Sequence, residues 1–227
     1  MLNFVLVESA LELVPKEVKR LPAVASDARR RQKDPSEILL DRSVHHSAMA
    51  KLEDSEKRGR PDLVHVTLLN VTGTPLYLDG SVRVFVHTYD GVVLEIAEKT
   101  RIPKNYLRFR GLMEKTLVER PKQELIKVHD MSVKELLRMI SSDETIGLSV
   151  QGKMMSLEEL AKKVTAAKNP SVIIGGFPHG HFSPGTLSVV DQLVRVDARP
   201  LEAHVVASRV IYEVEKAQAS STIKSAS

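Results

Sequence analysis

Short apolar runs alternate with amphipathic segments along most of the chain. Leu2–Ser9 is an unbroken apolar run of strand length, and the next segment, residues 11–21, has a helical pattern up to its proline. In the second half, strands are predicted for ELIKVH (124–129), TIGLSV (145–150), PSVIIGGF (170–177) and QLVRVD (192–197), and helices for 132–140, 156–164 and 200–218. Strands that alternate with helices predict an α/β fold with a mostly parallel, helix-covered sheet.

The middle of the chain has a different pattern. Residues 81–98 contain two β-branched alternating runs around Tyr89-Asp90-Gly91, which predicts a hairpin. Helices are predicted around 45–55 and from Pro103 onward. Residues 63–71 are apolar almost throughout, so the pattern fits either a buried strand or a buried helix.

Composition excludes several classes of protein. The 227 residues include no cysteine, which removes disulfide scaffolds, thiolate metal sites and cysteine nucleophiles. Apolar residues make up 42% and charged residues 27%, as in ordinary globular domains. No apolar stretch is long enough for a membrane span and no signal peptide is evident, so we expect a cytoplasmic protein with no membrane partner.

The net charge of +4 is concentrated in the first half of the chain. Residues 1–122 hold 21 Lys and Arg against 17 Asp and Glu, whereas residues 123–227 hold 12 of each. The runs at 29–33 and 99–110 contain four and five bases, with no acid. Such runs attract phosphates, but a solvated basic surface without a partner explains them equally well.

A glycine cluster follows the predicted strand at 170–177. Gly175, Gly176 and Gly180 would let backbone approach a ligand closely, in the crevice where open parallel sheets bind ligands. The alternative is an ordinary turn between a strand and a loop. Two further proline-containing turns, at 183–191 and 199–208, could converge on the same pocket.

The histidines next to these glycines suggest a second kind of chemistry. His179 and His181 could bind zinc with Asp191 or His204, as in a metallohydrolase. Against this, alternate residues of an extended segment point to opposite faces. We therefore predict no metal site.

RGRPDLVH, at 58–65, combines paired arginines, a proline suited to a helix start and an acid directly after it. Asp62 could merely stabilise the helix dipole. It could also be a carboxylate that faces a substrate group able to donate a hydrogen bond or lose a proton.

Several longer segments resemble those of a known family. They are DRSVHHSAMAKL, RGRPDLVHVTLLNVTGTPL, EKTRIPKNYLRFRGLMEKTL, the glycine cluster and the closing RPLEAHVVASRVIYEVE. The chain resembles the archaeal members of the ribosome-biogenesis pseudouridine N1-methyltransferase family, the nucleolar essential protein family of the SPOUT class. The resemblance runs in order from about residue 2 to residue 218.

The resemblance implies an α/β-knot fold with a deep trefoil knot near the C-terminus. It implies one methyltransferase domain over 1–218, with a basic lobe near 21–60, a β-hairpin extension near 76–100, and a flexible tail at 219–227. It also implies a homodimer that binds S-adenosyl-L-methionine in the knot loops. The cofactor-binding residues would then be Gly175, Gly176, Gly180, Leu187, Leu201 and Ala203.

For the reaction, the resemblance implies N1-methylation of a pseudouridine in a hairpin loop of small-subunit rRNA during ribosome biogenesis. Asp62 would hydrogen-bond or deprotonate N1 of the base, and Arg60 beside it would hold the base or a phosphate. The RNA-binding residues would be Arg58, Arg60, Arg101, Lys104 and Arg108. Ribosomal proteins of the small subunit are further possible partners, and a non-catalytic rRNA-binding assembly factor is the alternative function.

Overall fold

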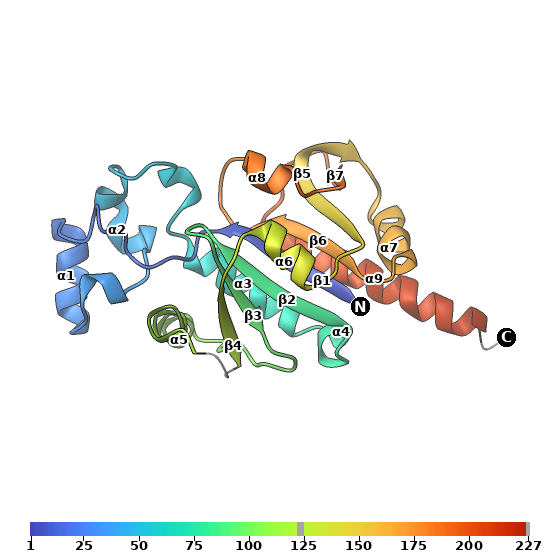
Figure 1. The fold of residues 1–227 in the computed structure, drawn as a ribbon, viewed down its shortest axis with the longest axis horizontal. Helices are drawn as coiled ribbons and strands as arrows, with labels where there is room; N and C mark the ends of the chain where they lie inside the picture. The colour runs from blue at the N-terminus through green and yellow to red at the C-terminus, as the bar shows by residue number, and fades with distance from the viewer. Residues whose placement is uncertain (122–124, 226–227) are drawn as a thin grey trace.

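The structure is a computed structural model that describes residues 1–121 and 125–225. Its centre is a seven-stranded sheet in the order β4-β3-β2-β1-β6-β5-β7 (Figure 1). The strands are β1 (Leu2–Ser9), β2 (Val82–Thr88), β3 (Val92–Ile96), β4 (Ile126–Asp130), β5 (Glu144–Met154), β6 (Pro170–Gly175) and β7 (Gln192–Arg195). The pairs β1-β2, β1-β6, β5-β6 and β5-β7 are parallel, whereas β2-β3 and β3-β4 are antiparallel. The predicted α/β class and the hairpin around Gly91 are therefore confirmed.

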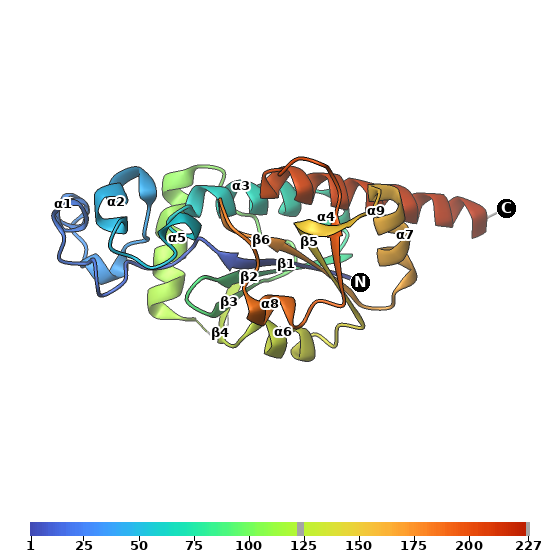
Figure 2. The same cartoon turned by 90° about the horizontal axis from the view of Figure 1, so that it is seen from above.

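Helices cover both faces of this sheet. They are α1 (Pro22–Arg31), α2 (Arg42–Met49), α3 (Pro61–Thr72), α4 (Pro75–Leu78), α5 (Tyr106–Glu119), α6 (Val133–Met139), α7 (Leu157–Ala166), α8 (Pro184–Leu187) and α9 (Ala203–Ser225). Figure 2 shows α3, α7 and α9 on one side and α6 and α8 on the other. Alternate residues of β1 separate the two cores, because Phe4 and Leu6 face the first group of helices and Val5 and Val7 face the second.

The α1–α2 lobe, residues 22–57, lies at one end of the molecule beside α5 (Figure 1). It has an apolar cluster that includes Val24, Ile38 and Met49 of the lobe and Val18 of the preceding segment. The lobe lies within the stretch near 21–60 that the resemblance predicts as a basic addition, and that assignment stays a prediction. The second predicted addition, near 76–100, supplies β2, a central strand that pairs directly with β1.

Several predicted elements differ from the structure. Residues 11–21 contain no helix, because their backbone pairs with the segment 38–40 instead: Val14 N–H donates to Ile38 O at 2.9 Å, and Leu40 N–H donates to Glu12 O at 3.0 Å. The ambiguous segment 63–71 is helical, as part of α3. The helix predicted around 45–55 ends at Met49.

The ends of two helices also differ from their predicted positions. Helix α5 begins at Tyr106, where the Asn105 side chain accepts the N–H of Arg108, rather than at the predicted Pro103. Helix α9 continues past the predicted end at residue 218 to Ser225. The predicted tail includes residues 226–227 and the predicted strand at 124–129 begins at residue 124, all of which lie outside the described residues.

Strands β5 and β7 are a parallel pair with an irregular register and a tight contact at Gly152. Val194 of β7 pairs with both Leu148 and Lys153 of β5, so residues 149–152 bulge out of the ladder. A Cβ atom on Gly152 would lie 2.5 Å from the backbone of Val194, and only glycine fits there.

The trefoil knot itself stays a prediction. Among the described residues, no helix is long and apolar enough to cross a membrane.

Candidate active site

A cavity of about 490 Å³ opens where three parallel strands end. Its walls come from the middle of β5, the ends of β6 and β7, the loop after β6 and the start of α9. This is the side of a parallel sheet on which α/β folds bind ligands. The lining residues are Leu148, Ser149, Val150, Ile174, Gly175, Phe177, Pro178, His179, Gly180, His181, Phe182, Val194, Arg195, Val196, Asp197, Arg199, Pro200, Leu201, Glu202, Ala203 and Val206. The turn at 199–208 meets the glycine loop at this cavity as expected from sequence, whereas the turn at 183–191 contributes none of its lining residues.

Four of the six predicted cofactor residues line this cavity, namely Gly175, Gly180, Leu201 and Ala203. Leu187 and Gly176 are not among its lining residues. Gly176 packs against the end of β1, where a Cβ atom would lie 2.8 Å from Ser9 Cα. Its N–H also donates to Val7 O at 2.8 Å, so this glycine is required for backbone packing.

The cavity wall carries charges of both signs. Hydrogen bonds from the side chain and backbone of Arg199 lower the pKa of Asp197 to about 2, so this carboxylate is ionised at neutral pH. Glu202 adds a second carboxyl group to the wall. Arg195 Nε is buried and has no hydrogen-bond partner among the described residues. Arg195 Nε–H could therefore donate a hydrogen bond to an acceptor on a ligand.

Asp62 lies in the first turn of α3, directly after the N1 proline. Arg60 clamps its carboxylate with two hydrogen bonds, Nε to Oδ1 at 2.8 Å and Nη2 to Oδ2 at 2.9 Å. Partial burial opposes ionisation, but the hydrogen bonds and charge of Arg60 outweigh it and hold the pKa of Asp62 below its usual value. A carboxylate of low pKa is a weak base, which suits it to accept a hydrogen bond rather than to remove a proton outright.

Lys57 and Gly180 bring the segment before α3 against the glycine loop. A Cβ atom on Gly180 would lie 2.9 Å from Lys57 Cε, and the backbone of Gly180 has a φ of +105° that favours glycine. The Lys57 ammonium donates to His181 O and lies 4.5 Å from the centre of the Phe177 ring. The predicted catalytic and cofactor segments are thus neighbours in space.

The structure separates the predicted RNA-binding residues into two groups. Arg101, Lys104 and Arg108 are exposed and form no ion pair with the described residues. Arg58, by contrast, is buried and bound by Glu12 through Nε to Oε1 at 2.8 Å and Nη2 to Oε2 at 2.6 Å. Arg58 is therefore not placed to contact RNA, contrary to the prediction.

The exposed bases are anchored to the helix that carries Asp62. His65 of α3 forms a 2.7 Å hydrogen bond through Nε2 with Pro103 O, and its ring stacks on Phe109 at 4.3 Å between centroids. The loop that holds Arg101 and Lys104 is thereby fixed against α3. Sequence reasoning did not assign a role to His65, although it belongs to the RGRPDLVH motif.

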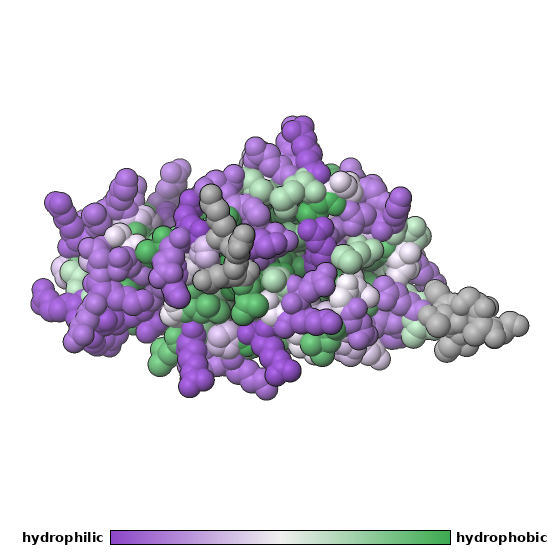
Figure 3. All heavy atoms as spheres, turned by 60° about the horizontal axis from the view of Figure 1, so that its bottom comes forward, coloured by the Kyte–Doolittle hydropathy of each residue, from purple (hydrophilic) through white to green (hydrophobic). Residues whose placement is uncertain are grey.

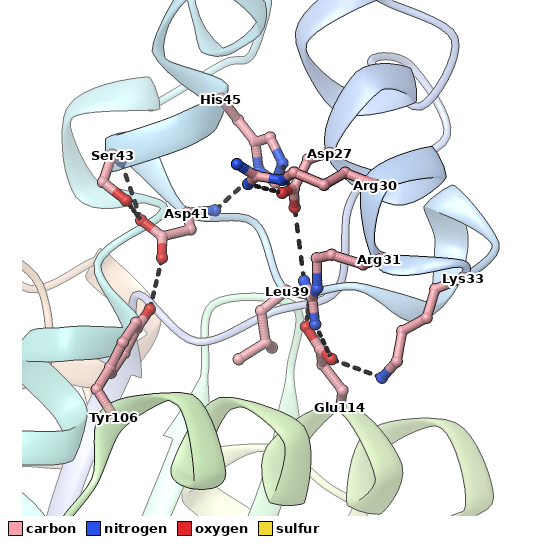
Figure 4. A network of polar contacts seen from close by, with 10 residues as sticks. All are labelled: Asp27, Arg30, Arg31, Lys33, Leu39, Asp41, Ser43, His45, Tyr106 and Glu114. Carbon is pink, nitrogen blue, oxygen red and sulfur yellow. Dashed lines mark hydrogen bonds and ion pairs between the residues drawn. The ribbon is translucent and has the colours of Figure 1, made fainter.

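Three of the four bases at 29–33 form ion pairs (Figure 4), although Arg29, Arg30 and Lys33 are exposed to solvent. Arg31 and Lys33 both bind the carboxylate of Glu114, which also accepts the N–H of Leu39 at 3.1 Å, and Arg30 binds Asp27. The contacts with Glu114 join the α1–α2 lobe to α5, and a phosphate-binding role for the exposed bases of this run stays a prediction. Within this run only Arg29 is exposed with no ion pair to a described residue.

The same network includes two further polar contacts. Tyr106 donates its hydroxyl to Asp41 Oδ2 at 2.5 Å, and burial together with Asp41 raises the pKa of this phenol. His45 Nδ1 accepts the N–H of Asp41 at 3.1 Å, and burial lowers the pKa of His45. Both side chains are therefore neutral at pH 7, and they fix the position of α2 above α5.

The four candidate zinc ligands do not all line the cavity. His179 and His181 line the cavity, but His204 and Asp191 do not. Asp191 instead accepts the N–H of Thr145 at 2.8 Å. Among the described residues, no three His, Cys, Asp or Glu side chains come together in an arrangement that could hold a metal ion.

Comparison with known proteins gives one consistent family. The model of the EMG1/NEP1 methyltransferase family matches residues 4–215. The ribosomal RNA small subunit methyltransferase Nep1 of Staphylothermus marinus is 42% identical over 219 residues, which cover 94% of this chain and 95% of that protein. The protein of the same name from Thermococcus onnurineus is 40% identical and covers 95% and 98%, respectively.

Solved structures agree with the sequence comparison. Archaeoglobus fulgidus Nep1 bound to S-adenosylhomocysteine superposes with a TM-score of 0.86 at 38% identity, covering 96% of this chain and 98% of that chain. A probable methylase family protein from Haemophilus influenzae has a TM-score of 0.50 at 13% identity, which extends the likeness of fold beyond close relatives; the match covers 99% of this chain and 67% of that chain.

Proposed function

Because the chain belongs to the EMG1/NEP1 methyltransferase family, we propose that it transfers a methyl group from S-adenosylmethionine to N1 of a pseudouridine in a hairpin loop of small-subunit rRNA. The coarser activity, methylation of small-subunit rRNA with this cofactor, rests on relatives of that name and on a relative's complex with S-adenosylhomocysteine. The pseudouridine target rests on the family resemblance and on the chemistry of Asp62.

The cavity supports the choice of cofactor. Its volume lies in the range of small-molecule sites, and Gly175 and Gly180 place bare backbone on its wall. Asp197 and Glu202 offer carboxylate acceptors, while Arg195 Nε is a donor without a partner. S-adenosylmethionine supplies a methyl group already activated by its sulfonium centre, so the protein has mainly to position the attacking nitrogen.

Asp62 suits an N–H donor on the target base. In pseudouridine the ribose is bonded to carbon, which leaves a hydrogen on N1, whereas N1 of uridine is bonded to the ribose and has none. An ionised carboxylate at the start of α3 can accept that N–H and increase the electron density on the nitrogen as it attacks the methyl carbon. The bond from nitrogen to the methyl carbon forms as the bond from that carbon to sulfur breaks, and the N1 proton, made acidic by the new bond, then passes to Asp62 or to water. Arg60 keeps the carboxylate charged and oriented.

The surrounding surface is suited to RNA. Arg101, Lys104 and Arg108 are exposed beside α3, and the end of the molecule that holds the α1–α2 lobe is predominantly hydrophilic on the face shown in Figure 3. We assign phosphate contacts to these three bases. We also propose that the reaction takes place in the cytoplasm and that ribosomal proteins of the small subunit are further partners.

The homodimer is also part of the proposal. Val66 of α3, Leu78 of α4 and Tyr212 of α9 are large apolar side chains that are 40%, 51% and 59% exposed. Their helices pack together in one layer, so a second copy could cover them at the same time. A Tyr212→Glu variant should then elute as a monomer when wild type elutes as a dimer.

The proposed reaction is tested with two hairpin RNAs that differ only in having pseudouridine or uridine at one loop position. With S-adenosylmethionine, we expect methylated nucleoside from the first RNA alone, identified by mass spectrometry after digestion. Equal methylation of both RNAs would contradict the N1 assignment. Tight binding of both RNAs and cofactor without methyl transfer would favour the non-catalytic assembly factor.

A further inference from the structure

Glu8, the penultimate residue of β1, holds an unusual backbone conformation. Its φ of +49° lies in the left-handed region, which is uncommon for a residue with a side chain. The residue is only 8% exposed, and its carboxylate accepts two hydrogen bonds, from Lys57 Nζ at 2.8 Å and from Ser183 N–H at 2.8 Å. Burial opposes its ionisation, but these two donors outweigh that effect and lower the pKa of Glu8.

Lys57 contacts both Glu8 and the loop 177–183, which contains the glycine turn after β6. Its ammonium contacts Glu8 Oε2, His181 O and the face of Phe177, and its aliphatic stem packs against Gly180. Phe177, Gly180 and His181 all line the cavity, whereas Glu8 and Lys57 do not. The two charged residues therefore act on the cavity through the loop 177–183.

Lys57 also belongs to the segment that leads to the proposed target-binding residues. It ends the turn Ser55–Lys57, and Arg60 and Asp62 follow within five residues. The backbone N–H of Arg60 donates to Ala10 O at 3.1 Å, which ties this segment to the end of β1 close to Glu8. A displacement of the cofactor loop would thus act directly on Lys57 and on the segment that contains Arg60.

We propose that Glu8 and Lys57 are positioning residues that fix the loop 177–183 against the segment of Arg60 and Asp62, so that binding of the cofactor and binding of RNA strengthen each other. This inference rests on the proposed function. Coupling between two ligands is reciprocal, and typical values change affinity by about 5-fold to 150-fold.

The test uses the full-length protein and measures calorimetric binding of S-adenosylhomocysteine with and without saturating pseudouridine hairpin RNA. In wild type we expect RNA to lower the Kd by about 5-fold or more. In Lys57→Met, which keeps most of the stem but loses the ammonium, we expect a Kd about 10-fold higher without RNA and little further change with RNA. Lys51→Met is the matched control, because Lys51 is exposed in the same lobe and has no ion pair to a described residue.

Kinetics separate positioning from a general loss of structure. In Lys57→Met the KM for S-adenosylmethionine should rise about 10-fold, while kcat at saturating cofactor and RNA should stay within about 3-fold of wild type. Glu8→Gln should reproduce this pattern, and it serves as the second variant if Lys57→Met does not fold.

Wild-type affinity and wild-type coupling in both variants would overturn the inference while leaving the proposed function intact. Failure of wild type to bind S-adenosylhomocysteine would overturn the proposed cofactor site, and this inference with it. Methylation of uridine hairpins by wild type would contradict only the pseudouridine assignment, since the binding test does not depend on the methylated atom.

Discussion

Replacing Glu114 by Gln should destabilise the protein strongly, although the change is conservative and lies on a helix that appears polar in sequence. The Glu114 side chain is fully buried and its carboxylate accepts from Arg31, from Lys33 at 2.7 Å and from Leu39 N–H at 3.1 Å (Figure 4). An amide has one acceptor oxygen and would direct its NH₂ group at donors. Arg31 and Lys33 would then both lose their ion pair with Glu114.

The magnitude follows from how much of the network remains. Removal of one partner from a buried ion pair costs about 3–5 kcal/mol. The lower end applies here, because Arg31 still lies 3.5 Å from Asp27 and Lys33 can reach water. A loss of about 3 kcal/mol corresponds to a fall in Tm of about 6–12 °C for a chain of this size.

Thermal melting at pH 7 measures the effect, with Glu119→Gln as the control. Glu119 lies on the same helix and its pairing with Lys115, at 3.8 Å, is between exposed side chains, so we expect a change below about 0.5 kcal/mol. Because the network lowers the pKa of Glu114, its contribution is complete above about pH 5 and is lost as the pH falls through the folded-state pKa. Equal Tm values for the two variants at pH 7 would refute this account of the network.

Three further predictions concern the site. Asp62→Asn should lower single-turnover methyl transfer by about 100-fold or more with little change in Tm, since the amide keeps the shape but loses the charge; transfer near the wild-type rate would reduce Asp62 to a structural residue. Alanine at both Arg101 and Arg108 should reduce the salt slope of hairpin binding by about two units, and an unchanged slope would exclude phosphate contacts there. Gly176→Val should destabilise the fold by about 2 kcal/mol or more through its clash with Ser9, and an unchanged Tm would show that the close approach is relaxed in solution.

Sequence predicted those parts of the fold whose signal is local. The hairpin was recognisable from a glycine at a position of positive φ, and Gly91 has a φ of +85°. The segment 11–21 was mispredicted because its hydrogen-bond partners, Ile38 and Leu40, lie far along the chain. A helical pattern cannot reveal that a distant strand-like segment will take the same backbone groups.

The same limit applies to charged residues of the site. Arg58 and Arg60 contribute equally to a count of charges. In the structure, however, Arg58 is bound by Glu12 in the interior, whereas Arg60 binds Asp62. Nothing adjacent to Glu8 marks it as a contact of the cofactor loop, since its partner Ser183 is 175 residues away. Motifs indicated which segments carry the chemistry, and only tertiary pairing shows which of their charges remain available.

The most direct test of the proposed cofactor site is a pair of calorimetric titrations with S-adenosylhomocysteine. Ala203 lines the cavity at the start of α9, so Ala203→Phe would fill the space assigned to the cofactor. We predict one bound molecule per chain in wild type and an affinity at least about 100-fold lower in the variant. Because Ala203 is buried and also packs against the core, we expect a lower Tm in the variant, and binding is measured well below that Tm. Equal affinity in the two proteins would contradict the assignment of this cavity to the cofactor.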